Sequence, residues 1–192
     1  MPYIDQASLD DTGRVRLAQL GTGHPSSSTF LRGDQAWAVP LGGGGPSLAR
    51  KAANQTINGN AYQDITDLPF ALAANTPYHF IFYIVFRSAA TTTGFGFSVN
   101  GPANSLLDYI VHYQTTANAA LTGDVTQRKD TAYDAMGALN ATVTAGVNLR
   151  CRMEGILRTT AAGTLAARVR SELANNDLVV QAQSVGILTT FS

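Results

Sequence analysis

The residues that could carry chemistry are few, and their spacing matches no catalytic or metal-binding motif. The histidines are His24, His79 and His112, and no two of them stand at the His-x-x-x-His spacing of a helical metal site. Cys151 is the single cysteine, which excludes an intrachain disulfide and a multi-cysteine zinc or iron–sulfur site. We expect core or surface histidines, no metal and no cofactor; one histidine from each chain around a trimer axis is the alternative.

Acid, base and nucleophile sets are equally weak. Asp108 and His112 are four residues apart, so a strand would place them on one face, but no Gly-x-Ser-x-Gly element supplies a nucleophile. Glycoside hydrolysis needs two carboxylates. The candidates are Asp108, Asp124, Asp130, Asp134, Glu154 and Glu172. The two glutamates are better explained as partners of neighbouring arginines, so we expect a protein that is not an enzyme.

Two short motifs are better explained by backbone geometry than by binding. The tetraglycine at residues 42–45 is followed by Pro46 rather than Lys-Ser/Thr, so it is not a phosphate loop. Arg32, Gly33 and Asp34 form an integrin-type tripeptide, but glycine and aspartate also form turns. We therefore interpret the tripeptide as a turn rather than as an adhesive loop.

Composition excludes several classes of protein. The 192 residues contain 13 Lys+Arg and 13 Asp+Glu, so the net charge is zero and nothing predicts binding to nucleic acid or to an anionic membrane. Charged residues make up 14% and hydrophobic ones 45%, which indicates a folded chain. Glu154 and Glu172 are the only glutamates, and helical proteins use glutamate freely on their surfaces. This favours an all-β protein.

The chain ends and apolar runs predict a soluble protein made in a cytoplasm. Residues 1–11 have neither the basic nor the apolar region of a signal peptide. The longest apolar run, Phe80–Phe86, is far too short to span a bilayer.

Residues 1–46 form the first predicted segment, an extended arm that ends in the flexible tetraglycine and Pro46. Its apolar residues are too sparse for an independent core. We expect the arm to become ordered against a partner in an assembly, through Tyr3, Ile4, Leu9, Phe30, Leu31 and Trp37.

Residues 47–192 predict a β-sandwich. Short strand-like segments recur with Gly, Asn and Thr between them, and about eight antiparallel strands would make a jelly roll. Tyr78–Arg87 is apolar throughout, as in a strand covered on both faces. Thr131–Leu139 is a weak helix candidate within a further strand candidate. The expected strands are Gln63–Leu72, Tyr78–Arg87, Gly94–Asn100, Leu106–Gln114, Asp130–Ala138, Val147–Arg158, Gly163–Leu173, Asp177–Gln183 and Val185–Phe191.

Two of these strands alternate most clearly and carry both glutamates among arginines. Leu149–Leu157 and Thr164–Leu173 each place apolar side chains on one face, and Thr159–Gly163 would join them as a hairpin. Adjacent cationic faces repel, so we expect this face to meet a neighbouring subunit that completes the network; a face that stays in solvent is the alternative. The predicted subunit-interface residues are Arg150, Arg152, Glu154, Arg168, Arg170 and Glu172.

A short element in the arm resembles one found in bacteriophage tail-fibre and related appendage proteins. Its usual form there is G-x-G-x-x-S-x-x-T-F-L-R-G-D-G-x-W. The matching residues here are Gly21, Gly23, Ser26, Thr29, Phe30, Leu31, Arg32, Gly33, Asp34 and Trp37. This chain has Gln35 where the element usually has glycine.

The body resembles a C-terminal module of phage structural proteins, so the resemblance covers about residues 20–192. The resembling pieces begin at Tyr78, Arg87, Phe97, Met153 and Ala162. The resemblance implies a jelly-roll domain, usually a homotrimer, presented on a virion.

We therefore expect a bacteriophage fibre or appendage protein whose arm attaches to other virion proteins of the tail or capsid. A capsid decoration protein (head cement or head fibre) is the alternative, and a module that binds a host-surface glycan is the second.

Overall fold

The computed structural model describes residues 30–31, 37–38, 45–115, 125–135 and 143–191. The chain divides into two compact units, Met1–Gly43 and Gly44–Ser192. In the first unit, β1 (Phe30–Leu31) pairs antiparallel with β2 (Trp37–Ala38). Tyr3, Ile4 and Leu9 lie outside the described residues, so the proposed role of the arm stays a prediction.

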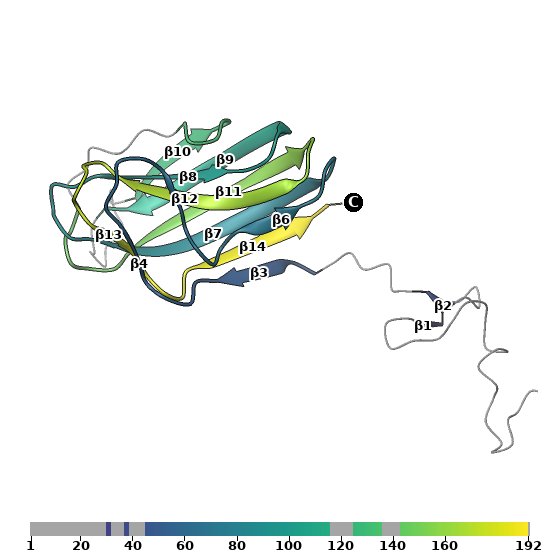
Figure 1. The fold of residues 1–192 in the computed structure, drawn as a ribbon, viewed down its shortest axis with the longest axis horizontal. Helices are drawn as coiled ribbons and strands as arrows, with labels where there is room; N and C mark the ends of the chain where they lie inside the picture. The colour runs from purple at the N-terminus through teal and green to yellow at the C-terminus, as the bar shows by residue number, and fades with distance from the viewer. Residues whose placement is uncertain (1–29, 32–36, 39–44, 116–124, 136–142, 192) are drawn as a thin grey trace, which may run out of the picture. The chain divides into compact units, whose positions relative to one another are not determined.

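Every regular element described in the second unit is a β-strand, and every pairing is antiparallel (Figure 1). This confirms the all-β, jelly-roll fold class. No helix among the described residues is long and apolar enough to cross a membrane. The strands are β3 (Ser47–Arg50), β4 (Gln55–Ile57), β5 (Gln63–Asp64), β6 (Phe70–Leu72), β7 (Pro77–Ser88), β8 (Phe95–Asn100), β9 (Asn104–Gln114), β10 (Val125–Asp130), β11 (Leu149–Thr159), β12 (Gly163–Ser171), β13 (Leu178–Val180) and β14 (Val185–Thr190).

The larger sheet is built around β7. One side of β7 pairs with β11, which is followed by β9 and β10. The other side pairs with β14 along its first half and with β13 near its end, and these pair in turn with β3 and β4. The order is therefore β10-β9-β11-β7. Beyond β7 lie β14 and β13, which pair with different parts of β7, and then β3 beside β14 and β4 beside β13.

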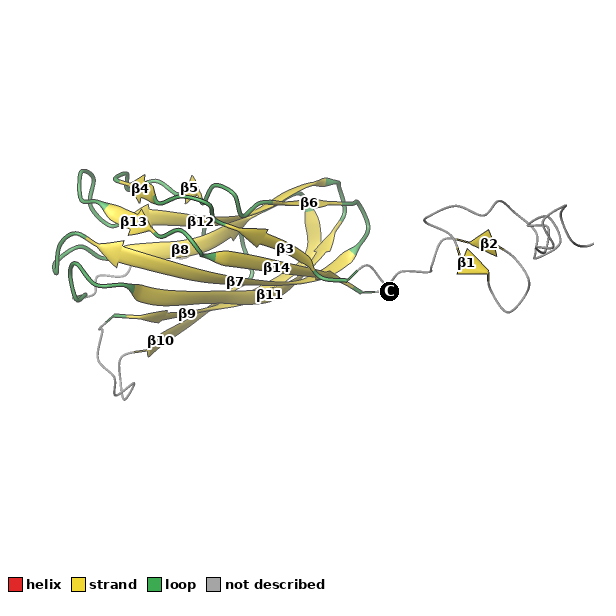
Figure 2. Ribbon diagram, turned by 90° about the horizontal axis from the view of Figure 1, so that it is seen from below, coloured by secondary structure: helices red, strands yellow, loops and turns green. Residues whose placement is uncertain are grey.

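The smaller sheet is built around β12. One side of β12 pairs with β8, and β5 and β6 also pair with it at different points along its length. Figure 2 separates the layers, with β12, β5 and β6 on one side and β9, β10 and β11 on the other. From β4 to β9 the chain changes sheet at every connection except the one within β5–β6, which is the alternation of a jelly roll.

The core between the sheets is aromatic. Phe86 of β7 meets Phe95 and Phe97 of β8, with ring centroids 4.6 and 5.0 Å apart in edge-to-face geometry. Such pairs contribute about 0.5–1.5 kcal/mol each beyond the area they bury. Phe80 and Phe82 are fully buried on the same face of β7. Alternate residues of β7 and β8 thus meet in the core, together with the buried residues of β9, β11 and β12.

The structure corrects the expected hairpin between the arginine-rich strands. β11 pairs with β7 and β9 in the larger sheet, whereas β12 pairs with strands of the smaller sheet. The link at residues 160–162 crosses between the layers. The alternation along β11 is confirmed, since Leu149, Cys151 and Met153 are all buried, whereas Leu173, expected on the apolar face of the other strand, is 47% exposed.

Two other expected strands differ from the structure, and two short strands were not expected. Residues 131–135 form turns rather than a strand, because β10 lies earlier; 136–138 lie outside the described residues. The expected strand Gln63–Leu72 is broken between β5 and β6. β3 and β4 were not predicted, since their short segments have little apolar alternation.

Candidate functional site

The open face of the larger sheet is the candidate functional surface. The buried residues of β7 alternate with His79, Ile81, Tyr83 and Val85, which are partly or well exposed. The expectation that Tyr78–Arg87 is covered on both faces is therefore wrong for a single chain, because the smaller sheet covers one side only. We call the outward side chains of β3, β7, β9, β10, β11 and β14 the open face.

Strand register defines rows across the open face. Ile110 of β9 lies opposite Glu154 of β11, Glu154 opposite Ile81 of β7, and Ile81 opposite Ile187 of β14. Leu48 of β3 completes this row opposite Ile187. Four of its five side chains are aliphatic, although the row belongs to the surface of the chain.

Large exposed apolar side chains gather on this face. The described part of the chain has seven of them, and all except Leu173 lie on the open face or directly continue it. Leu48 is 75% exposed. We define the apolar half of the face as Leu48, Ile81, Leu106, Ile110, Ile156, Ile187 and Phe191. Exposed apolar side chains that gather on one face are typical of an interaction surface in soluble proteins.

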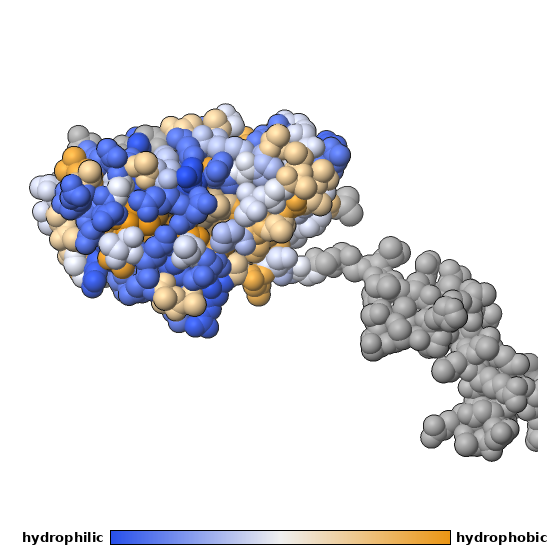
Figure 3. All heavy atoms as spheres, in the orientation of Figure 1, coloured by the Kyte–Doolittle hydropathy of each residue, from blue (hydrophilic) through white to orange (hydrophobic). Residues whose placement is uncertain are grey.

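Figure 3 shows the opposite side of the sandwich, on which hydrophilic residues are mixed with smaller hydrophobic areas; the open face lies on the far side of this view. The apolar half is the part of the open face that continues to Phe191, next to the C-terminus.

A charged group interrupts the apolar half. Glu154 Oε1 lies 3.2 Å from His79 Nε2, within hydrogen-bond distance, and the Glu154 carboxylate forms an ion pair with Arg152. The His79 ring also lies near that of Phe191, with centroids 6.3 Å apart. This group is partly exposed, so water screens it in an isolated chain. A subunit that covered the face would bury it together with the aliphatic side chains.

The six predicted interface residues do not share one surface. Arg150, Arg152 and Glu154 project from β11 on the open face. The other three belong to β12 and the residue after it, in the other layer. The structure therefore separates the set into two groups of three, and the interface role of each stays a prediction.

On the smaller sheet, Arg168 pairs with aspartates rather than with a glutamate, and Arg170 contacts an aromatic ring. Arg168 Nε lies 2.8 Å from Asp64, its Nη1 pairs with Asp134, and its Nη2 donates to the Tyr62 carbonyl at 2.8 Å. Arg170 lies over the Tyr62 ring, 5.0 Å from the centroid. These partners come from distant segments, so sequence spacing could not have identified them.

Glu172 has a structural role in this layer. Its carboxylate accepts a hydrogen bond from the Gly94 backbone N–H at 2.8 Å, and its own N–H donates to the Gly94 carbonyl. The expected pairing of Glu172 with a neighbouring arginine is replaced by this link to the segment before β8.

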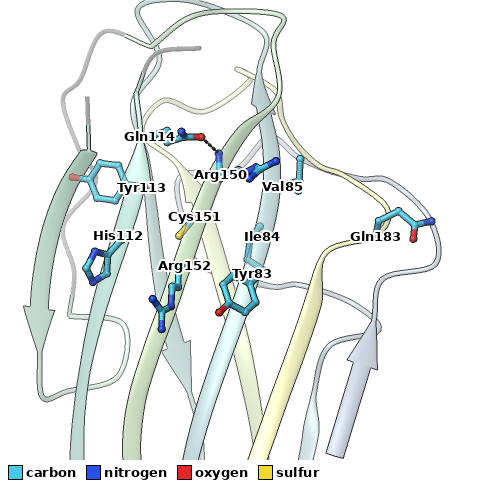
Figure 4. A pocket seen from close by; sticks show the side chains of 10 residues that line it. All are labelled: Tyr83, Ile84, Val85, His112, Tyr113, Gln114, Arg150, Cys151, Arg152 and Gln183. Atoms are coloured by element: carbon cyan, nitrogen blue, oxygen red, sulfur yellow. Dashed lines mark hydrogen bonds between the residues drawn. The ribbon is translucent and has the colours of Figure 1, made fainter. Parts of the chain in front are cut away.

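The opposite end of the open face is hollowed. A cavity of about 410 Å³ is lined by side chains of β7, β9 and β11 and by Gln183 from the segment between β13 and β14 (Figure 4). Arg152 lies over the Tyr83 ring, 5.7 Å from the centroid. We call this cavity the basic hollow, defined by Tyr83, Val85, His112, Gln114, Arg150, Arg152 and Gln183. Sequence analysis did not find it, because its residues meet only through strand pairing.

Most side chains that could take part in a reaction are paired or buried in the described structure. Asp108 forms an ion pair with Lys129 at 2.8 Å. Cys151 is buried, and burial raises the pKa of its thiol well above its ordinary value, which disfavours the reactive thiolate. Within the residues described, no three His, Cys, Asp or Glu side chains form a metal-ion cluster.

A buried cation that the sequence did not reveal joins two edge segments. Lys51 is 1% exposed, and its Nζ donates to Thr66 Oγ1 at 2.6 Å and to Gln55 Oε1 at 3.0 Å. Burial lowers the pKa of Lys51, and the nearby Asp67 carboxylate partly opposes that shift. We assign Lys51 a structural role, since its amine points at main-chain and side-chain acceptors inside the fold.

Comparison with known proteins gives fold-level similarity at low identity. No family model and no curated protein matches the chain. The Eiger TNF structure from S. frugiperda is 12% identical over 77% of this chain and 92% of that chain, with a TM-score of 0.37. The structure of the infectious bursal disease virus Gx strain is 10% identical over 89% of this chain, with a TM-score of 0.23. The VP2 subviral particle of the same virus is 12% identical over 88% of this chain, also with a TM-score of 0.23.

This chain covers 45% of each of the two viral chains. These values assign no function to the protein.

Proposed function

We propose that this chain is a non-enzymatic structural protein of a bacteriophage virion, a homotrimeric fibre or appendage. Residues 1–46 would attach it to other virion proteins, and the β-sandwich would be displayed outward. The virion assignment rests on the resemblance of the arm and body to phage appendage proteins, carried in the arm by residues such as Phe30, Leu31 and Trp37.

The observation that supports self-association is the apolar half of the open face. Exposed aliphatic side chains from β3, β9, β11 and β14 lie together, instead of being scattered over the surface. Burying them against copies of the same chain removes apolar area from water, at about 25 cal/mol per Å². Closed cyclic symmetry does this without forming an open filament.

The state of the carboxylates supports a structural role over glycoside hydrolysis. Asp108 is paired with Lys129, and Glu154 is paired with Arg152 and contacts His79. Each is thus engaged by cationic neighbours on the surface of the sheet rather than arranged as an acid and a base across a substrate cleft.

Light scattering on the purified full chain tests self-association. We expect a mass close to three times 20.2 kDa at micromolar concentration. Ile156→Lys places a charge in the apolar half and should lower that mass. Leu173→Lys is the matched control, because Leu173 is similarly exposed (47%, against 41% for Ile156) but lies off the open face.

Two outcomes would contradict the assignment. A monodisperse monomer of the unmodified chain would overturn the trimer. A trimer that tolerates Ile156→Lys as well as it tolerates Leu173→Lys would show that another surface holds the subunits together.

Deletion of residues 1–45 tests the arm. We expect the truncated chain, which retains all of β3–β14, to stay folded but no longer to join particles. Normal occupancy of the truncated protein in purified virions would place the anchor elsewhere. Imaging of those virions would also distinguish an appendage on the tail from a decoration on the capsid.

A further inference from the structure

The basic hollow is a candidate ligand site that is separate from the apolar half. Strand register places Arg150 opposite Val85, and Arg152 opposite Tyr83 and His112. These rows lie toward the end of β7, whereas Ile156 and Phe191 lie near its beginning. A ligand in the hollow and a subunit on the apolar half would therefore use different parts of the open face.

The size and shape of the hollow suit a small molecule. Its volume of about 410 Å³ lies within the usual range for ligand pockets, about 300–1,000 Å³. Tyr83 and Val85 give it an apolar wall on β7, and the polar groups come from three other segments. Figure 4 shows side chains of neighbouring strands arranged around this space.

Most of the surface of the hollow is apolar, and its charged groups are the two arginines. No aspartate or glutamate is among the residues that line it. Within the described structure, no carboxylate lies within 4.0 Å of the Arg150 guanidinium, which is exposed. Gln114 Oε1 accepts from the Arg150 backbone N–H at 3.2 Å, and the amide NH₂ of Gln114 can donate to a ligand.

One of the two arginines is held in place before any ligand arrives. The Arg152 guanidinium is paired with Glu154 on one side and stacked over the Tyr83 ring on the other. A fixed guanidinium loses little side-chain freedom on binding. Arg150, which has no carboxylate partner among the described residues, is the arginine whose planar fork matches the two oxygens of a ligand carboxylate.

We propose that the basic hollow binds an acidic saccharide, through the carboxylate of a uronic-acid unit. The sugar ring would lie against Tyr83 and Val85, its carboxylate would meet Arg150 and Arg152, and its hydroxyl oxygens would accept from the glutamine amides. This goes beyond self-association and does not depend on it.

Two arginines without a carboxylate in the lining are the reason for choosing an acidic sugar over a neutral one. Each hydroxyl of a neutral sugar both donates and accepts, so a neutral sugar is best held where side-chain acceptors such as carboxylates are also present. A carboxylate only accepts, and two arginines offer it charge-assisted hydrogen bonds. Phosphate shares this chemistry, so the experiment must separate the two anions.

Titration calorimetry of the full chain with trigalacturonate, its methyl ester and glycerol 3-phosphate tests the proposal. We expect saturable binding of trigalacturonate and at least tenfold weaker binding of the ester, which keeps the shape but loses the charge. Glycerol 3-phosphate should also bind at least tenfold more weakly, because it lacks the sugar ring.

The matched variants are Arg150→Gln and Arg158→Gln. Both arginines are exposed on the same face of β11, but Arg158 lies outside the hollow. Arg150→Gln should weaken trigalacturonate binding at least tenfold, Arg158→Gln should change it less than twofold, and neither should alter the circular dichroism spectrum.

The proposal is overturned by absent binding, by equal affinity for acid and ester, or by equal effects of the two variants. Tighter binding of glycerol 3-phosphate than of trigalacturonate would also overturn it, since the site would then select phosphate.

Discussion

Replacement of Tyr109 by phenylalanine should change both the stability of the sandwich and its dependence on pH. Tyr109 is 1% exposed, and its hydroxyl lies 2.9 Å from Ser98 Oγ and donates to the Ala132 carbonyl at 3.2 Å. Ser98 Oγ in turn accepts from the Asp134 N–H at 3.0 Å. The hydroxyl therefore links β9 to β8 and to the turn after β10.

At neutral pH the substitution removes a buried hydroxyl and leaves its partners without it. Such a loss costs about 1–3 kcal/mol. The free energy of unfolding of Tyr109→Phe should fall by this amount in urea titrations. Tyr83→Phe is the control: its ring is exposed, so the change should stay within about 0.5 kcal/mol.

The pH dependence follows from the raised pKa of Tyr109. Burial disfavours the phenolate and raises the pKa of Tyr109 from 10.0 to about 12. Because the folded state holds its proton more tightly than the unfolded state, this stability is fully present below pH 10 and is lost as the pH rises through about 12. Two pKa units correspond to a total of about 2.7 kcal/mol, and about 1.4 kcal/mol is lost by pH 11.

The assay is the difference in unfolding free energy between the unmodified chain and Tyr109→Phe, measured from pH 8 to pH 11. Subtraction removes the contribution of all other titrating groups. The difference should shrink by about 1.4 kcal/mol over this range. A difference that stays constant with pH would refute the argument that the folded state keeps the Tyr109 hydroxyl protonated.

Two further predictions use matched pairs of variants and denaturant unfolding. A Cβ on Gly155 would lie 2.4 Å from the Asp108 carbonyl oxygen, so Gly155→Ala should destabilise the chain by about 1–3 kcal/mol or more. A Cβ on Gly45 would meet nothing within 4 Å, so Gly45→Ala should not destabilise the chain. Equal unfolding midpoints for the two variants would contradict this prediction. Arg168→Gln removes the contacts to two aspartates and a carbonyl, so it should lower the free energy of unfolding by about 1–3 kcal/mol. Arg158 is exposed, so Arg158→Gln should change the free energy of unfolding by no more than about 0.5 kcal/mol. An unchanged free energy of unfolding for Arg168→Gln would mean that solvent replaces these contacts.

Local sequence determined the strand class and much of the alternation. The scarcity of glutamate and the recurring short apolar segments predicted an all-β body, and the structure confirms it. Along β11, alternation correctly assigned Cys151 and Met153 to the core and Arg150 and Arg152 to the surface. Alternation succeeds because successive side chains of a strand point to opposite faces, whichever strands lie beside it.

Tertiary structure alone decided which strands are neighbours. A link of three residues between β11 and β12 is compatible with a hairpin in one sheet or with a crossing between two layers, since both bury the same alternate residues. The choice depends on β7 and β9, which pair with β11 from distant parts of the chain. This choice of neighbouring strands separated the two groups of arginines. It also gave Arg168 two aspartate partners that the spacing of residues in the sequence did not indicate.

The same reason explains why sequence analysis did not find the apolar half and named only Arg150 and Arg152 of the basic hollow. Tyr78–Arg87 is apolar on both sides, but the number of layers in the fold determines whether its outer side is covered within the chain. The basic hollow brings together β7, β9 and β11 with Gln183 from a connecting segment. Strand periodicity fixes which way each side chain points, whereas strand pairing over long sequence separations decides what it faces.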